Sequence, residues 1–170
     1  MSGVNGGPEW LPALVELNDF GGDWHTYVEA LYRIFRRDFV ENAPSFPGRR
    51  WAMKRHPEYQ GKEATFWHII SEGEDEAERI PDLRRCERIA WPRCIIDAFA
   101  TNNVRVWKQE RRGETRVAIA TADFGYLVVL ADRGSYIMLW TAFVVERAHQ
   151  RRKYEREYLT WRKAQAEGRT

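Results

Sequence analysis

Four runs rich in Val, Ile, Tyr and Trp follow one another in the second half of the chain, and short turns join them. The runs cover residues 104–109, 115–122, 126–131 and 136–145. Residues with β-branched and aromatic side chains favour strands, and turns this short join antiparallel neighbours. The sequence therefore predicts a four-stranded antiparallel meander, and the rest of the chain has to fold around it.

The remaining segments alternate between helical and extended patterns. Asp23 precedes apolar residues at helical spacing as far as Phe39, which predicts a capped amphipathic helix. A helical region is expected from Pro81, restarted or kinked at Pro92, and a last helix is expected at 146–166. We expect a strand or extended segment at 49–55, a turn at 56–62, a strand at 64–70 and a loop at 71–78. The expected fold is α+β, a curved antiparallel sheet of four or slightly more strands with N-terminal helices on one face and a C-terminal helix.

Length and composition place the chain among ordinary globular proteins. With 170 residues, 44% of them hydrophobic, we expect a single domain at 23–167 after a flexible or docking segment at 1–22. There is no apolar run of the roughly 18 residues that a membrane span requires, and the N-terminus lacks the features of a signal peptide. We expect a cytoplasmic protein with no membrane partner. Cys86 and Cys94 match no zinc spacing and are expected to be free thiols.

Charged residues are segregated along the chain although the 27 basic and 25 acidic residues nearly balance. Residues 1–32 contain five acids and no Lys or Arg, whereas cations gather at 33–55, 84–112 and 147–163 among several Trp residues. Such clusters fit nucleic-acid binding, but they also fit a solvated surface. The acidic first segment either covers a basic site of the same chain or packs as the first helix, and its apolar face favours packing.

The sequence lacks the common catalytic signatures. It has no glycine-rich phosphate loop, no GxSxG, no HExxH and no CxxC pair, and its four histidines are far apart. We expect neither a metal nor a cofactor.

His68 is the side chain that most suggests chemistry. In the expected strand it shares a face with Phe66 and Ile70, where an imidazole without a partner is costly to bury. A structural histidine with a satisfied partner is one reading. The other rests on the cations around it in the sequence, because a base among positive charges is what metal-free RNA cleavage requires. These cations are Lys54, Arg55, Lys62, Arg84, Arg85, Arg88 and Arg93.

Four segments resemble a known family. They are GKEATFWHIIS, RIPDLRRCERIAWPRCII, the meander from Val106 to Val145 with its LWTAF ending, and the basic helix HQRRKYEREY. Together they resemble phage-associated members of the barnase/EndoU/colicin/RelE-like superfamily of metal-independent ribonucleases, over about residues 47 to 159. That resemblance implies a four-stranded antiparallel sheet with N-terminal helices. It also implies an endoribonuclease that attacks through the 2′-hydroxyl, acting as a toxin or in phage conflict.

The resemblance also assigns roles and partners. It implies His68 as general base or acid, Thr141 as a holder of the scissile phosphate, and Arg88 and Arg93 as electrostatic residues. RNA-binding residues would be Lys54, Arg55, Lys62, Arg84 and Arg85. The expected partners are RNA, such as tRNA or mRNA, and a cognate antitoxin or inhibitor protein.

Several alternatives stay open at this point. Thr141 also fits an ordinary β-branched strand residue, and Arg88 an ion pair with an acid of 72–78. A non-catalytic RNA- or protein-binding module on the same fold is the main rival to an enzyme. A phage or prophage accessory protein that binds an acidic partner is the third reading.

Overall fold

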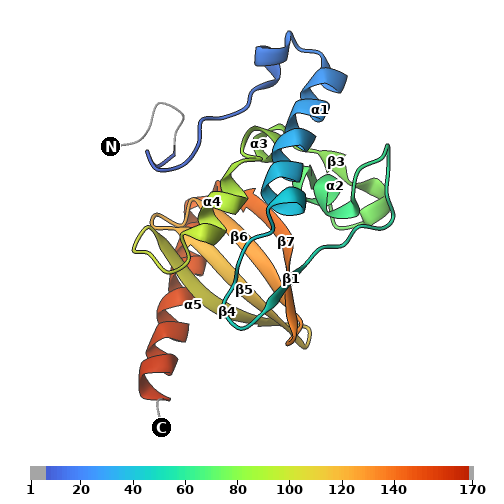
Figure 1. Cartoon of the computed structure of the whole chain (residues 1–170). Coiled ribbons are helices and arrows are strands. Elements are labelled where there is room, and N and C mark those ends of the chain that lie inside the picture. Colours follow the sequence, from blue (N-terminus) through green and yellow to red (C-terminus); the bar gives the residue numbers. More distant parts are fainter. Residues whose placement is uncertain (1–6, 169–170) are drawn as a thin grey trace. The chain divides into compact units, whose positions relative to one another are not determined.

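The meander expected between residues 104 and 145 is present and forms most of a five-stranded sheet (Figure 1). The computed structural model describes residues 7–168. Its strands β4 (Val104–Arg111), β5 (Glu114–Thr121), β6 (Tyr126–Asp132) and β7 (Tyr136–Val144) pair antiparallel in chain order. At the first turn Arg112 and Gly113 both have positive φ, as a two-residue hairpin turn requires. The predicted antiparallel meander is therefore confirmed.

A fifth strand makes the sheet mixed. Strand β1 (Arg50–Ala52) lies within the segment expected to be extended, and it pairs in parallel with β7. Arg49, just before β1, donates two hydrogen bonds to the Asp132 carboxylate at 2.9 and 3.3 Å. This ion pair holds the start of β1 beside the end of β6. The sheet order is β1-β7-β6-β5-β4, so β4 is an edge strand.

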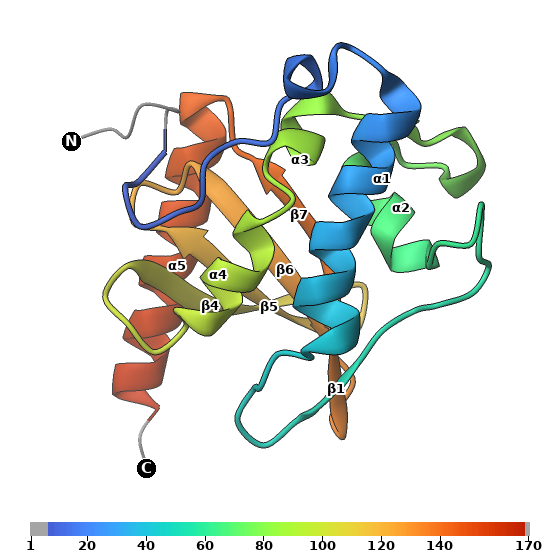
Figure 2. The same ribbon diagram turned by 45° about the horizontal axis from the view of Figure 1, so that its top comes forward.

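Helix α5 (Ala148–Glu167) covers one face of the sheet near that edge, as Figures 1 and 2 both show. Its residues Tyr154, Tyr158 and Trp161 pack against a core cluster that includes Trp107 and Phe124. The predicted closing helix is thus confirmed, with its apolar stripe on the sheet. The α+β class of the chain is confirmed as well.

The described residues form two compact units. The first contains those up to Ser45 together with Met53–Cys94, and the second contains Phe46–Ala52 and those from Ile95 onward. The boundary falls within α4 (Trp91–Asp97). The sheet and α5 belong to the second unit. The expectation of a single domain at 23–167 stays a prediction.

The first unit is mostly helical. In chain order it contains η1 (Leu17–Phe20), α1 (Trp24–Phe35), the π-helical η2 (Arg36–Glu41), α2 (Ala64–Ile70), β2 (Ser71–Glu72), η3 (Glu76–Glu78), β3 (Ile80–Pro81), α3 (Leu83–Glu87) and the start of α4. The Asp23 carboxylate accepts a hydrogen bond from the Thr26 backbone and so caps α1 as predicted. Tyr27, Leu31 and Phe35 of α1 are fully buried. The acidic first segment therefore packs as the first helix.

The segment before α1 docks on α3 and α4. The Val15 N–H donates to the Glu87 carbonyl, and the Trp91 indole donates to the Pro12 carbonyl. The expectation of a flexible or docking segment at 1–22 stays a prediction, and residues 1–6 lie outside the described range. Among helices in the described part of the chain, none is long and apolar enough to cross a membrane.

The prediction of a strand at 64–70 is wrong, because these residues form helix α2. Its β-branched and aromatic residues favour a strand by intrinsic preference. Tertiary packing overrides that preference. The Phe66 ring packs against Tyr32 and Phe35 of α1, with ring centroids 5.2 and 5.5 Å apart, and Phe66 is fully buried. The acidic segment 71–78, expected to be a loop, contains β2 and η3.

We expect Asp132→Asn to lower the free energy of unfolding at neutral pH, because it removes the charge that Arg49 binds. Arg49 holds the pKa of the Asp132 carboxyl below its ordinary 3.8. A carboxylate whose pKa is lower in the folded than in the unfolded state stabilises the folded protein. This stabilisation is fully present at pH values above the unfolded-state pKa, and it is lost as the pH falls through the folded-state pKa. The difference between native and variant protein should be largest at pH 7 and shrink below about pH 4. Urea unfolding at pH 7, 5 and 3 measures it. An equal pH dependence in Glu58→Gln, whose side chain is exposed, would contradict the assignment.

Candidate functional site

A cavity of about 330 Å³ opens beside α2 in the first unit. Helix α2 and its C-cap provide one wall, and the turn before the helix and the β2–β3 hairpin provide the others. The cavity is lined by Pro57, Tyr59, Ala64, Trp67, His68, Ser71, Arg79 and Pro81.

The helical conformation of α2 determines which side chains face this cavity. Ala64, Trp67, His68 and Ser71 follow one another at spacings of three, one and three residues, which is one stripe of a helix. Phe66 lies outside that stripe, in the core. The expectation that His68 shares a face with Phe66 and Ile70 is therefore wrong. The half-buried imidazole faces the cavity instead.

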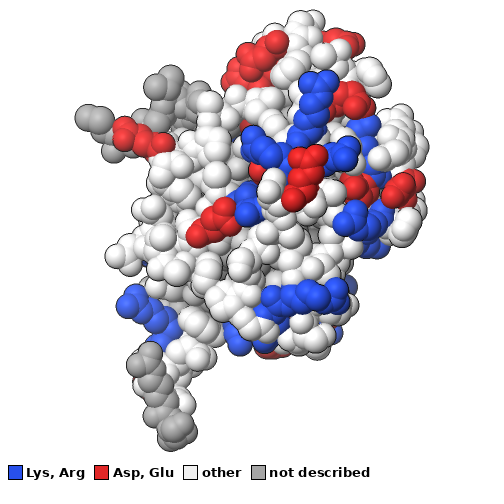
Figure 3. All heavy atoms as spheres, viewed as in Figure 1, with Lys and Arg blue, Asp and Glu red and all other residues white. Residues whose placement is uncertain are grey.

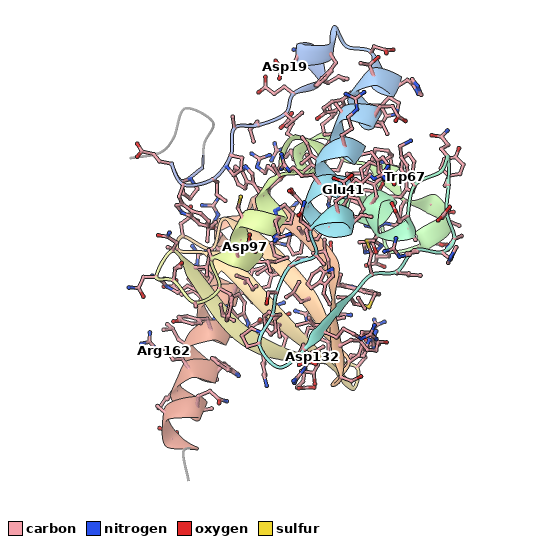
Figure 4. All side chains as sticks on the ribbon, in the orientation of Figure 1. Asp19, Glu41, Trp67, Asp97, Asp132 and Arg162 are labelled. Atoms are coloured by element: carbon pink, nitrogen blue, oxygen red, sulfur yellow. The ribbon has the colours of Figure 1, made fainter. Side chains whose placement is uncertain are left out.

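Two aromatic rings form one side of the cavity. The rings of Tyr59 and Trp67 meet edge to face with centroids 5.4 Å apart, and the Trp67 indole N–H donates to the Tyr59 carbonyl at 2.9 Å. Figure 4 labels Trp67 beside α2. Tyr59 is 63% exposed. An exposed ring fixed by its neighbour is a suitable platform for stacking a planar ligand.

Arg79 holds the end of α2 that carries His68. Its guanidinium donates to the carbonyl of His68 at 2.8 Å, to that of Gly73 at 2.6 Å and to that of Ser71. These bonds tie the last turn of α2 to the residues that follow it, and the His68 carbonyl also accepts the Ser71 backbone N–H. Sequence reasoning assigned Arg79 no role. Its position in an acidic stretch gives no signal for a residue whose partners are backbone atoms.

Lys54 and Arg55 lie between β1 and α2, and their backbone contacts the start of α2. The Lys54 carbonyl accepts from the Thr65 backbone N–H at 3.0 Å, and the Arg55 carbonyl accepts from Ala64 at the same distance. Both basic side chains are exposed. The Arg55 guanidinium lies 3.7 Å from the Glu63 carboxylate. These two cations are thus available at the surface next to the cavity.

Lys62 is buried and its ammonium is held within the first unit. It is 5% exposed, pairs with the Glu29 carboxylate at 2.5 Å and lies 5.2 Å from the centre of the Tyr32 ring. This pairing is the first cause of the lowered pKa of Glu29. The structure therefore places Lys62 in a structural ion pair, and a role in RNA binding stays a prediction.

The predicted basic helix divides at Arg88, which ends α3 before α4 begins. The Arg88 guanidinium donates to the Arg84 carbonyl at 3.1 Å and lies 5.1 Å from the Trp91 ring centre. Its acidic neighbour is Glu87, at 3.6 Å, rather than the ion-pair partner from 72–78 considered above. Arg84 is exposed and Arg85 is half-buried on the same short helix.

Arg93 points to the end of η2. Its guanidinium donates to the carbonyl of Asp38 at 2.5 Å and to that of Asn42. These contacts close the C-terminal end of the π-helix. Arg88 and Arg93 therefore have separate partners, and neither lines the cavity beside His68.

Thr141 lies on β7 in the second unit, opposite Val129 of β6, and is half-buried. His68 belongs to the first unit, so each residue is described in its own surroundings. A shared site of the two residues stays a prediction.

Among the described residues, the Cys86 thiol and the possible metal ligands give little indication of a second functional site. Burial raises the pKa of the Cys86 thiol to about 12, which keeps it protonated and unreactive. No group of three or more His, Cys, Asp or Glu residues within 7–168 is arranged to hold a metal ion. On the face shown in Figure 3, acidic and basic side chains are mixed over α1 and α2.

Comparison with known proteins yields no relative. No family model matches the sequence, and no curated protein and no solved structure shows a significant match.

We expect Arg79→Ala to lower the free energy of unfolding by about 2 kcal/mol, because three carbonyl groups lose a charged donor. Chemical denaturation followed by circular dichroism measures the change. Arg33→Ala is the control, since this exposed arginine on α1 should change stability by less than about 0.5 kcal/mol. Equal stabilities of the two variants would show that Arg79 does not hold the end of α2.

Proposed function

We propose that this chain is a metal-independent endoribonuclease with His68 as its proton-transferring residue. The observation that carries the proposal is the position of the imidazole, which faces an open cavity beside an exposed aromatic wall. A histidine at a cavity wall can exchange protons with a bound ligand near neutral pH. The resemblance of the sequence to the ribonuclease superfamily agrees with this chemistry.

The proposed reaction needs no oxidant and no cofactor. His68 accepts the proton of the ribose 2′-hydroxyl, and the 2′-oxygen attacks the adjacent phosphorus. The bond to the 5′-oxygen of the next nucleotide breaks, that oxygen takes a proton from solvent water, and His68 returns its proton to solvent. The products are a 2′,3′-cyclic phosphate end and a 5′-hydroxyl end. Thr141, Arg88 and Arg93 remain proposed contributors at the phosphate on the strength of the resemblance.

The cavity supports an RNA substrate through its shape and lining. Its volume of about 330 Å³ is at the small end of ligand pockets and suits a single base. Tyr59 offers a ring on which a base can stack, as proteins that bind single-stranded RNA commonly do. The exposed Lys54 and Arg55 side chains can contact phosphate groups outside the cavity.

Arg79 is a positioning residue in this scheme. Arg79 lines the cavity, and its guanidinium binds the carbonyl of His68, so it fixes the backbone that carries the imidazole. A positive group at this place also favours a bound phosphate. The proposed biological setting is that of a toxin acting on cellular RNA in the cytoplasm, silenced by a cognate antitoxin or inhibitor protein.

We expect the purified protein to cleave single-stranded RNA in the presence of EDTA and His68→Ala to lower the rate by about 10²- to 10⁴-fold, because a proton acceptor is lost. Gel analysis of a labelled oligoribonucleotide, with mass spectrometry of the ends, identifies the cyclic phosphate. His25→Ala is the matched control, because His25 is an exposed histidine on α1. The two variants should have similar melting temperatures.

The His68 experiment separates the enzyme from its main rival. RNA binding without cleavage by the native protein would indicate a binding module and overturn the proposed activity. Equal loss of cleavage in His25→Ala would remove His68 from the mechanism.

We expect Tyr59→Ala to raise KM for RNA by roughly 5- to 150-fold, the range for loss of one stacked base, with a smaller effect on kcat. Tyr59→Phe keeps the ring and should restore the native KM. Steady-state cleavage of a short oligoribonucleotide measures both constants. The fold should tolerate both changes, because the Tyr59 side chain is mostly exposed. An equal rise of KM in Tyr59→Phe would argue against stacking.

A further inference from the structure

A groove of about 610 Å³ runs between the edge strand β4 and helix α5, entirely within the second unit. Strand β4 contributes four consecutive residues to it. Helix α5 contributes a single stripe at helical spacing, which spans about 16 Å at the usual rise of a helix. The groove is lined by Lys108, Gln109, Glu110, Arg111, Lys153, Arg156, Glu157, Thr160, Trp161 and Ala164.

The acidic groups of the groove already have partners. The Glu157 carboxylate accepts hydrogen bonds from the Trp107 indole at 3.2 Å and from the Gln109 amide at 2.8 Å, and Arg111 lies 3.8 Å from it. Glu110 accepts a hydrogen bond from the Thr115 hydroxyl at 2.8 Å. The negative charge at the base of the groove is therefore bound internally.

Two cations of α5 at the rim have no such partner. In the described part of the chain, no carboxylate lies within salt-bridge distance of Lys153 or Arg156, and both side chains are exposed. The Lys108 side chain alternates with those of Trp107 and Gln109, which face α5, and so points to the opposite face of the sheet. Exposed cations whose charge no carboxylate of the groove binds are stabilised by an anionic ligand. The ligand that fits must place several negative charges along the length of the groove.

Trp161 restricts the ligand class further. Its indole packs on the core cluster of the sheet, is half-buried and lines the groove. A partly exposed ring among cations combines the two features of single-stranded nucleic-acid sites, which are base stacking and phosphate contacts. An acidic protein would use the cations but would have no planar group for the ring.

We propose that the β4–α5 groove binds single-stranded RNA, with phosphates on Lys153 and Arg156 and a base on Trp161. The choice of RNA as the nucleic acid rests on the proposed ribonuclease function. The groove is a binding site separate from the His68 cavity, and it adds affinity without taking part in the chemistry.

The test measures binding of a fluorescent single-stranded oligoribonucleotide by anisotropy, using full-length His68→Ala protein so that the RNA stays intact. We expect the additional double change Lys153→Gln and Arg156→Gln to weaken binding about tenfold or more at 100 mM salt. The slope of log affinity against log salt should fall by about one to two units, because two phosphate contacts are lost. The control is Arg152→Gln with Lys163→Gln, which removes two exposed cations of α5 that do not line the groove. It should stay within about twofold of the parent protein.

Three outcomes would overturn the proposal that the groove binds single-stranded RNA. Equal weakening in the control pair would indicate non-specific attraction to α5. Equal or tighter binding of an RNA duplex would contradict stacking on Trp161, and stronger competition by poly-glutamate than by RNA would favour an acidic protein. Cleavage by the native protein is scored separately. If the native protein does not cleave RNA but binding still depends on the groove cations, the proposed activity fails and the groove proposal stands. If the native protein cleaves RNA but the groove variants bind RNA as tightly as the parent protein, only the groove proposal is rejected.

Discussion

The burial of Phe66 against Tyr32 and Phe35 is the contact on which the rest of the candidate site depends. A seven-residue helix has little stability of its own, so its tertiary contacts decide its conformation and its rotation. With Phe66 fixed in the core, His68 two residues later must face roughly the opposite way, while the Trp67 ring lies beside Phe66 with centroids 5.2 Å apart. The cavity, its aromatic wall and the exposure of the imidazole all follow from that one packed ring. Arg79 then closes the end of the helix through backbone carbonyls.

The meander could be predicted because its signal is local. Each run is long enough for strand preference to be recognised, and Gly113 and Gly134 lie at turns that require positive φ. The prediction of a strand at 64–70 failed because the contacts that decide its conformation are not local. Its apolar residues fit a strand by type and a short helix by spacing, and seven residues are too few to separate the two. The deciding partners are in α1, more than thirty residues earlier in the chain.

Sequence reasoning selected residues for the candidate site by their chemistry, and the structure shows what that reasoning could not see. His68 was singled out because an imidazole among the apolar residues of a strand is unusual; in the helix it lies on the stripe that lines the cavity instead, and its role stays a prediction. Lys62 and Arg93 were chosen because cations are frequent around them. The structure gives them nearer partners, a carboxylate for Lys62 and two carbonyl groups for Arg93. Counting cations along a sequence cannot show which acceptor each one will find, and backbone acceptors such as those of Arg79 leave no mark in the sequence at all.

The cavity beside His68 has few positively charged side chains, so most of the affinity for RNA would have to come from another part of the surface. Phosphate contacts supply much of the free energy of nucleic-acid binding, and they require cations that are not already neutralised. Arg79, a single cation, uses its donors on three backbone carbonyl groups, although it keeps its charge, and the aromatic wall is neutral. Such a cavity suits recognition of a base and proton transfer better than tight binding of a polyanion. A ribonuclease built on it therefore needs a separate cationic surface, and the two exposed cations of α5 at the rim of the β4–α5 groove, Lys153 and Arg156, have the exposure that this task demands.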